Sequence, residues 1–361
     1  MAQLLNVEDL ILNYDPEAPQ DRFRTADFDM AALSESARLP RAVPWPAPFA
    51  PVGAPLTQAP AETDDLSRFN GYDAVVVTWT SAEAAALAAL LSPGYPVSQW
   101  YEYRHNVSQY IPLVTGKTAP FNSTQADMTR YYHSLGLYFP CRIGNARVLL
   151  FKSGLHLDYD GPAVPVRKLM QELATVVAPK LFVTTGTGGG IGKDVLLGDV
   201  VVANKTRFFC TSKFKEEPWS NASYPTSTLP ENALASITPS LTQVNAKLIS
   251  GGRPEPKIWS DSAIVTTDFF GFDDSTDYYK LQGKGSACDM GDAMVGNAMQ
   301  DFPAIRWYSI RNASDPQIPD PTGNIEAAKQ EAGKIYLQYG ALTTAASVIT
   351  SWAVIKASFS S

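Results

Sequence analysis

The stretch VTTGTGGGIGKDVLLGDVVVANK, residues 183–205, places five glycines between Gly186 and Gly192, with an apolar run before them and another after. Both runs are typical of buried strands. Glycines between two strands let the backbone turn tightly or approach a ligand closely, because glycine lacks a Cβ. We therefore expect a tight strand-to-strand turn that lets the backbone approach a ligand closely. A glycine-rich hairpin without a ligand is the alternative.

Two phosphate-binding motifs are excluded at this segment. The dinucleotide motif G-x-G-x-x-G requires a third glycine where the chain has Ile191. The P-loop motif requires glycine at Thr187 and serine or threonine at Asp194. Both motifs also lead into the N-terminus of a helix, whereas VLLGDVVVA is typical of a strand.

Strand and helix patterns alternate from residue 71 onward. Strands are predicted at 73–79, 146–154, 180–186, 196–209 and 304–315, and helices at 80–91, within 162–179 and at 325–357. Thr80 and Glu83 have capping-box spacing, which marks the start of the first helix. This alternation predicts an α/β fold with helices on both faces of the sheet, and ligands of such sheets bind at the carboxyl ends of strands.

The N-terminal part of the chain has a different character. Prolines are frequent between residues 40 and 60, which favours extended, polyproline-like backbone. We expect residues 1–70 to form an extension, either an arm packed on this chain or a neighbouring subunit, or a lid over a site. Residues 71–361 form the main domain, with an insertion at about 92–140.

Composition narrows the classes of function. The formal net charge of −7 disfavours a nucleic-acid partner but leaves small nucleosides possible. Three widely spaced cysteines, Cys141, Cys210 and Cys288, lack metal-binding spacing and suit a reducing compartment. The N-terminus is a poor signal peptide, and we expect no membrane-spanning segment. The sequence therefore predicts a soluble, cytoplasmic protein.

Four segments in order resemble the nucleoside phosphorylase and nucleosidase superfamily. They are TTGTGG with LLGDVVV, RIGNARVLLFKSGLH, VTTDFFGFDDSTDYY and ACDMGDAMVGNAMQDFPAIRWYSIRNASDPQ. The resemblance covers residues 72 to about 355. It implies a single α/β domain with a mixed, partly barrel-like central sheet flanked by helices, and cleavage of the N-glycosidic bond of nucleosides without metal or organic cofactor. It also implies a homo-oligomer.

Two carboxylates are the catalytic candidates that this resemblance implies. Asp315, in RNASD, matches the acid that protonates the leaving purine at N7, and a turn aspartate before a proline is the alternative. Glu83 matches the base that activates water in the nucleosidases, although it also completes the capping box. TWTSAEA lacks the arginine with which phosphorylases bind phosphate, so hydrolysis is favoured.

Phosphorolysis nevertheless stays open as an alternative. The fold could bring Arg104, Arg130 or Arg142 to the first loop, where a phosphate would need a cation.

The remaining site residues follow from the same resemblance. Met290 and Arg311 are predicted to hold the ribose, with Asp292 as its carboxylate if one residue is inserted, or Gly291 in that place if not. The aromatic that stacks on the base is predicted to be Phe269, with Phe270 as its rival. Ser153, Thr187, Gly188 and Ser314 are further predicted binding residues, and His156 is either a contact to the 5′ side of the sugar or a structural histidine.

The sequence as a whole predicts a purine nucleosidase-like hydrolase that uses water. A phosphorylase acting at the same site is one alternative. A non-catalytic nucleoside-binding module is another, because DMGDA departs from the family pattern.

Overall fold

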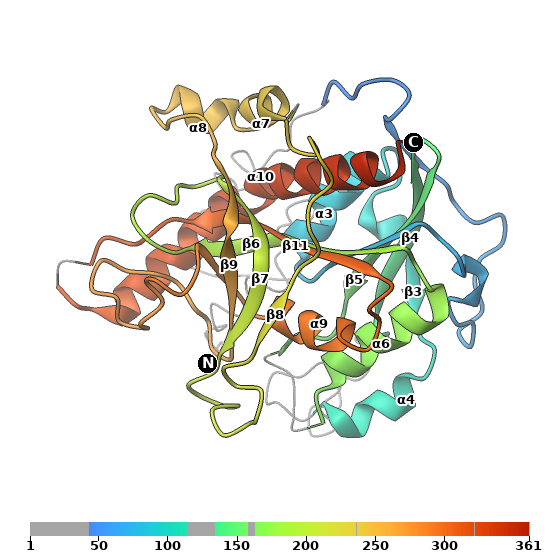
Figure 1. The fold of residues 1–361 in the computed structure, drawn as a ribbon, viewed down its shortest axis with the longest axis horizontal. Helices are drawn as coiled ribbons and strands as arrows, with labels where there is room; N and C mark the ends of the chain where they lie inside the picture. Colours follow the sequence, from blue (N-terminus) through green and yellow to red (C-terminus); the bar gives the residue numbers. More distant parts are fainter. Residues whose placement is uncertain (1–42, 115–133, 158–162, 236, 321, 361) are drawn as a thin grey trace, which may run out of the picture.

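A computed structural model of the chain describes residues 43–114, 134–157, 163–235, 237–320 and 322–360 (Figure 1). The strands are β1 (Pro51–Gly53), β2 (Ala74–Thr78), β3 (Tyr101–Tyr103), β4 (Gly136–Ile143), β5 (Ala146–Ser153), β6 (Leu181–Gly190), β7 (Val200–Phe209), β8 (Ser223–Pro225), β9 (Ile258–Thr267), β10 (Ala287–Asp289) and β11 (Arg306–Asp315). The helices are α3 (Ser81–Leu91), α4 (Val107–Tyr110), α6 (Pro165–Val177), α7 (Thr238–Val244), α8 (Ala246–Ser250), α9 (Asp292–Met299) and α10 (Ile325–Phe359), with short 3₁₀ turns at Ser67–Phe69, Val97–Gln99 and Ile111–Leu113.

One mixed sheet contains all the strands of the described residues, and part of it closes on itself. The path runs β1-β4-β5-β2-β6-β10-β9-β7-β11, and β11 pairs back with β6 to close a five-stranded barrel. Strands β2, β5, β4, β1 and β3 extend the sheet away from β6, and β8 pairs with β7 of the barrel. The predicted α/β fold with a partly barrel-like mixed sheet is confirmed.

Helices cover both faces of the sheet, as the alternating pattern predicted (Figure 1). Alternate residues of β2 belong to different cores: Val75 and Val77 pack with α6 and α9, whereas Ala74 and Val76 pack with α3 and α10. A strand buried on both faces needs a continuous apolar run, which explains the sequence AVVVT.

The glycine run continues β6 and does not form the predicted turn. Gly186, Gly188, Gly189 and Gly190 all lie within the strand, and the chain turns afterwards, between Ile191 and the start of β7. The prediction of a turn was wrong because β11 pairs with β6 as far as Gly189, so that ladder hydrogen bonds hold the glycines extended.

The middle of β6 lacks a strand on one edge. Residues Leu181 to Thr184 pair with β2 on this edge, and Gly189 and Gly190 pair with β10. Residues 185–188 are left between these partners. This gap lies at the carboxyl end of β2 and at the rim of the barrel, where a site was predicted.

The described part of the proline-rich segment packs against its own chain. The Trp45 ring lies 4.8 Å from that of Trp352 on α10, and Trp352 Nε1 donates to the Phe49 carbonyl at 2.8 Å. Strand β1 extends the sheet beside β4. Residues 43–60 therefore pack on this chain, residues 1–42 lie outside the described chain, and the role of residues 1–70 as an extension stays a prediction.

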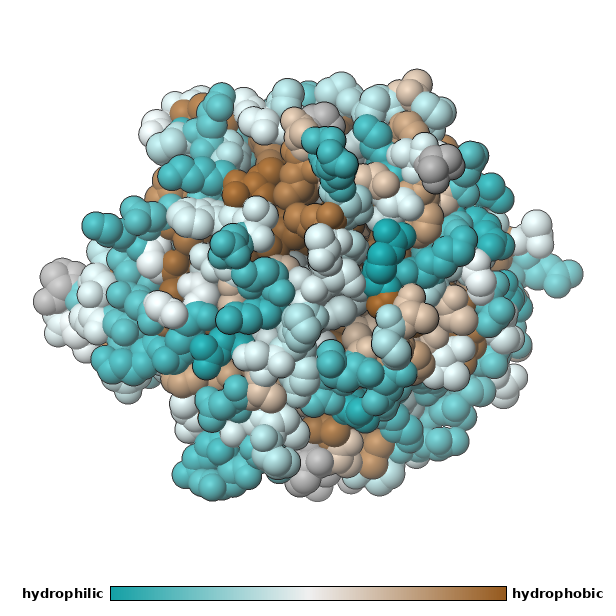
Figure 2. Space-filling view, viewed as in Figure 1, coloured by the Kyte–Doolittle hydropathy of each residue, from teal (hydrophilic) through white to brown (hydrophobic). Residues whose placement is uncertain are grey.

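Helix α10 is a buried helix in the core of the fold. It is the one described helix long and apolar enough to cross a membrane, yet 78% of its most apolar window is buried in the fold. Hydrophilic residues dominate the face shown in Figure 2, and hydrophobic ones emerge mainly in a recess between α7 and α10.

All three cysteines are buried free thiols.

Candidate active site

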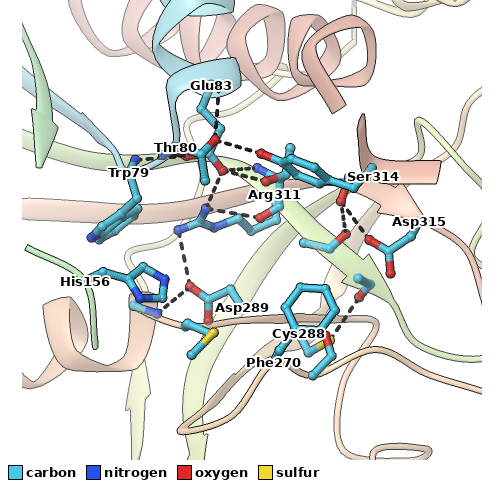
Figure 3. Close-up of a pocket in the computed structure, with 17 residues that line it drawn as sticks. Trp79, Thr80, Glu83, His156, Phe270, Cys288, Asp289, Arg311, Ser314 and Asp315 are labelled. Carbon is cyan, nitrogen blue, oxygen red and sulfur yellow. Dashed lines mark hydrogen bonds and ion pairs between the residues drawn. The ribbon is translucent and has the colours of Figure 1, made fainter. Parts of the chain in front are cut away.

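A pocket opens at the gap in β6, and the carboxyl ends of β2, β6, β10 and β11 supply most of its wall (Figure 3). It is lined by Trp79, Thr80, Glu83, His156, Thr187, Gly188, Gly189, Phe270, Gly271, Cys288, Asp289, Met290, Gly291, Arg311, Ser314, Asp315 and Tyr336. Seven of these were predicted as site residues from the sequence: Glu83, Thr187, Gly188, Met290, Arg311, Ser314 and Asp315. Their roles remain predictions, whereas their assembly around one pocket is a structural result.

Glu83 fills the gap in β6 with its carboxylate. It completes the predicted capping box, in which Thr80 Oγ1 accepts from the Glu83 N–H and Glu83 Oε2 accepts from the Thr80 N–H. The same Oε2 accepts from Thr78 Oγ1 and the Trp79 N–H, and Oε1 accepts from the Thr187 N–H and Oγ1. Glu83 thus satisfies the Thr187 N–H in the stretch of β6 that no strand pairs on that edge.

The glycines of β6 make room for carboxylates. A Cβ on Gly186 would lie 2.3 Å from Glu83 Oε1, and a Cβ on Gly189 would lie 3.1 Å from Asp315 Oδ2. Gly186 also has φ +150°, which side-chain-bearing residues rarely adopt. The bare backbone therefore lets two acidic side chains approach one strand.

Arg311 joins three carboxylates beneath the pocket. Its guanidinium contacts Asp292 Oδ2 through Nε at 2.8 Å, Asp289 Oδ2 at 3.2 Å and Glu83 Oε1 at 3.4 Å, and it lies 4.8 Å from the Trp79 ring centre. Burial lowers the pKa of Arg311, but the neighbouring carboxylates raise it by more than burial lowers it. The net shift of the pKa is therefore upward, and the side chain stays charged. One cation thus faces three acidic groups.

Glu83 is ionised despite its burial. Burial alone raises the pKa of its carboxyl, but Arg311 and the hydroxyl and N–H donors outweigh burial, so the pKa lies below its usual value.

Asp315 sits in a different environment, at the end of β11. A β-bulge between Ala313 and Asp315 shifts the register, so that consecutive residues Ser314 and Asp315 both reach the pocket. Ser314 Oγ lies 2.9 Å from Asp315 Oδ1. Burial raises the pKa of Asp315 to about 7, and the Ser314 hydrogen bond lowers it less. Near neutral pH this carboxyl can therefore donate a proton.

The raised pKa of Asp315 predicts a pH-dependent cost in stability. Between the unfolded pKa, near 3.8, and the folded pKa of about 7, the unfolded chain binds fewer protons, so stability falls as pH rises. Asp315→Asn removes this cost. We expect the variant's gain in unfolding free energy to be roughly 2–3 kcal/mol larger at pH 8 than at pH 5. Urea unfolding at both pH values measures it, and an equal gain at both would contradict the shift.

The predicted ribose carboxylate, Asp292, does not face the pocket. It is fully buried, and its oxygens accept from Ser309 Oγ and from Arg311 Nε and Nη2. Asp289 lines the pocket instead, and Gly291 does so without a side chain. A Cβ on Gly291 would lie 2.9 Å from the Trp79 ring. Asp289, and not Asp292, is therefore the carboxylate of this segment that faces the pocket.

Asp289 is held in place by short-range contacts. Its Oδ1 accepts from Thr266 Oγ1 at 2.6 Å, and its Oδ2 accepts from the Gly291 and Asp292 N–H groups. Burial and the neighbouring Asp292 raise its pKa, and Arg311 opposes them.

Two further predicted residues lie outside the lining. Phe269 stacks on Tyr279 with ring centres 4.7 Å apart, and its rival Phe270 lines the pocket. The Ser153 hydroxyl closes a turn after β5, donating to the Leu155 carbonyl at 2.7 Å and accepting its N–H at 3.1 Å. Neither side chain is part of the pocket lining, and each is engaged elsewhere.

Sequence reasoning missed Tyr336 and Trp79. Tyr336 lies on α10 and donates to Thr80 Oγ1 at 2.8 Å. No motif marks it, since it is one of several aromatics on an apolar helix. Trp79 was predicted to end a strand. It directly precedes Thr80, the first residue of the capping box, and this position at the carboxyl end of a strand was the signal that could have placed it at the site.

No second cation joins Arg311 from the predicted set. Arg104 pairs with Glu62 and Glu102 away from the pocket, Arg142 is exposed and outside the lining, and Arg130 lies outside the described residues. His156 lines the pocket, across Arg311 from Asp315 in the view of Figure 3. In the described chain, no three His, Cys, Asp or Glu side chains are grouped to hold a metal ion.

Solved structures with a similar fold include two enzymes. Futalosine hydrolase of Helicobacter pylori aligns with TM-score 0.50 and 13% identity over 80% of this chain and 99% of its own. A 5′-methylthioadenosine/S-adenosylhomocysteine nucleosidase from Colwellia psychrerythraea, in complex with adenine, aligns with TM-score 0.50 and 15% identity over 80% of this chain and 96% of its own. At such identities the likeness shows the fold alone. Among curated proteins no sequence matches.

A family model provides the assignment that these structures cannot. The model described as the phosphorylase superfamily matches residues 104–339, which include every strand of the barrel and all pocket residues except three at the end of β2 and the start of α3. The match, together with the closed barrel and the pocket at the gap in β6, shows that the chain belongs to the phosphorylase superfamily.

Proposed function

We propose that this protein hydrolyses the N-glycosidic bond of a purine nucleoside, releasing the free base and ribose. The observation that carries the proposal is Asp315, a buried carboxyl on the pocket wall whose pKa of about 7 leaves it partly protonated at neutral pH. Departure of a base requires a proton, and N7 of a purine is an acceptor that pyrimidines lack. The hydrolase and nucleosidase with the same fold accord with this proposal.

The charge of the pocket suits the transition state of such a reaction. Cleavage of an N-glycosidic bond passes through an oxocarbenium-like sugar, which carries positive charge. Three acidic side chains surround the single cation Arg311: Glu83, Asp289 and Asp292. Asp289 is ionised only in part at neutral pH, because burial and Asp292 raise its pKa, so the negative charge in excess of Arg311 is smaller than a count of three carboxylates gives. The excess negative charge stabilises a cationic sugar in a site of low dielectric.

The same charge favours water over phosphate as the nucleophile. A phosphate dianion needs cationic donors, as in bidentate arginine pairs. Among the described residues that line the pocket, Arg311 is the one lysine or arginine, and acidic side chains already bind it. Binding a dianion here would therefore add charge to an already acidic site.

The placement of side chains suggests how the substrate lies. Phe270 offers a ring for the base on the side of Asp315, and Asp289 with Met290 offers a carboxylate and a thioether for the sugar. We also propose a cytoplasmic location and a homo-oligomeric state, which follow from the composition and from the resemblance to the family.

Product release under defined conditions tests the proposal. We expect adenosine or inosine to yield free base without phosphate, and phosphate to leave the rate unchanged, as measured by chromatography. Release only with phosphate would replace hydrolysis by phosphorolysis. Binding of nucleosides without release of base would favour the non-catalytic binding module.

A further inference from the structure

The carboxylate of Glu83 has no acceptor site left for a water molecule. Oε2 accepts from one hydroxyl and two N–H groups, and Oε1 accepts from an N–H, a hydroxyl and Arg311 Nη1. A carboxylate offers about four lone-pair positions, and these six donors exceed them. Glu83 is also only 1% exposed. A water in the pocket therefore meets the donors of Glu83 rather than its oxygens.

Thr187 lines the pocket and donates its hydroxyl hydrogen bond to the Glu83 carboxylate. Its Oγ1 lies 2.7 Å from Glu83 Oε1, and the residue lines the pocket and is 8% exposed. A threonine hydroxyl has one proton to donate and two lone pairs to accept. While its proton points to Glu83, its oxygen can accept a proton from a molecule in the pocket.

We propose that Thr187 relays the proton of the attacking water to Glu83, a role that rests on the hydrolysis proposed above. The water oxygen forms a bond to C1′ of the sugar as the C1′–N bond breaks. The electron pair of that bond goes to the base, which takes the proton of Asp315. The water proton moves to Thr187 Oγ1, and the hydroxyl proton of Thr187 moves to Glu83 Oε1. Glu83 ends as an acid and Asp315 as a carboxylate, and exchange with solvent restores both.

The other two threonine hydroxyls around Glu83 do not have this combination of contacts. Thr78 Oγ1 makes an equally short bond, 2.7 Å to Glu83 Oε2, but Thr78 is fully buried and outside the pocket lining. Thr80 lines the pocket, but it contacts the Glu83 carboxylate through its N–H, and its Oγ1 accepts from the Glu83 N–H and from Tyr336. Thr187 alone among these three joins the pocket to the carboxylate by a hydroxyl.

Paired valine substitutions test the relay, because valine has nearly the shape of threonine. Thr187→Val and Thr78→Val each remove one hydroxyl donor from Glu83 at the same distance, so that both equally weaken its support. We expect Thr187→Val to lower kcat about 100-fold, with KM changed only a few-fold, and to lose at least ten times more than Thr78→Val. Thr187→Ser keeps the hydroxyl and should retain kcat within about tenfold of the wild type.

Several outcomes decide against the relay. If kcat falls equally in Thr187→Val and Thr78→Val, Thr187 only supports the Glu83 carboxylate. If kcat is undiminished in Thr187→Val, Thr187 takes no part in the reaction. Circular dichroism checks that the variants fold, and Thr187→Ala, which fills less space, replaces Thr187→Val if that variant does not. If the wild-type protein releases no base from any nucleoside, the proposed hydrolysis itself fails. Release of base with equal losses in the pair overturns the relay alone.

Discussion

Replacing Asp315 with asparagine should lower kcat by roughly 10²- to 10⁴-fold, the usual contribution of a positioned general acid. Asparagine preserves the shape of the side chain and can keep the contact with Ser314 Oγ, now 2.9 Å from the carboxylate. It has no acidic proton for the departing base. Steady-state release of base measures the effect. Asp301→Asn, on the surface beside Arg167, is the matched control and should keep the wild-type rate.

The pH profile of the wild-type enzyme tests the same assignment. The reaction needs the protonated form of Asp315, whose pKa is about 7. We expect kcat/KM to fall about tenfold per pH unit above pH 7, and the Asp315→Asn variant to lose this limb of the profile. An unchanged rate in Asp315→Asn, or a limb that persists in it, would identify another acid.

Replacing Arg311 with leucine should destabilise the protein by about 3–5 kcal/mol or more. The change leaves Glu83, Asp289 and Asp292 buried around one site without a cation. Buried carboxylates that lose their counter-charge keep the full cost of desolvation. Urea unfolding measures the loss in unfolding free energy. An m-value equal to that of the wild type shows that the two free energies can be compared.

An arginine on the surface provides the matched control for this loss. Arg167 pairs with Asp301, and the two side chains are 31% and 48% exposed. Arg167→Leu should cost about 1 kcal/mol or less, because exposed pairs contribute little. Adding Asp292→Asn to Arg311→Leu should recover part of the stability, since one of the unpaired charges is then absent. Equal losses in the two arginine variants would contradict the role of Arg311 as the centre of the acidic cluster.

Features encoded by local patterns were predicted correctly. The apolar run of β2, the capping box of Thr80 and Glu83, and the strand that ends at Asp315 all depend on neighbours within a few residues. Chain order then places the ends of β2, β6 and β11 at one edge of the sheet, because parallel strands joined by helices point the same way.

The sequence did not identify the residue that lines the pocket where a single residue step decides which way a side chain faces. Phe269 and Phe270 are adjacent aromatics, and Asp289 and Asp292 flank one short glycine-containing turn. Composition does not distinguish the members of either pair. The packing of Phe269 on Tyr279 and the engagement of Asp292 by Arg311 decided both.

The sequence by itself determined the α/β class and the strands that meet at the site, since these follow from hydrophobic period, capping and order along the chain. The two carboxylates on which the proposed chemistry depends were predicted from the resemblance to the family. Only the tertiary structure decided that the glycines lie within β6, that its unpaired edge is closed by Glu83, and that Tyr336 arrives from α10. The reason is physical. Such contacts join residues more than 100 positions apart, and they form only when the barrel closes and aligns strands that no local preference brings together.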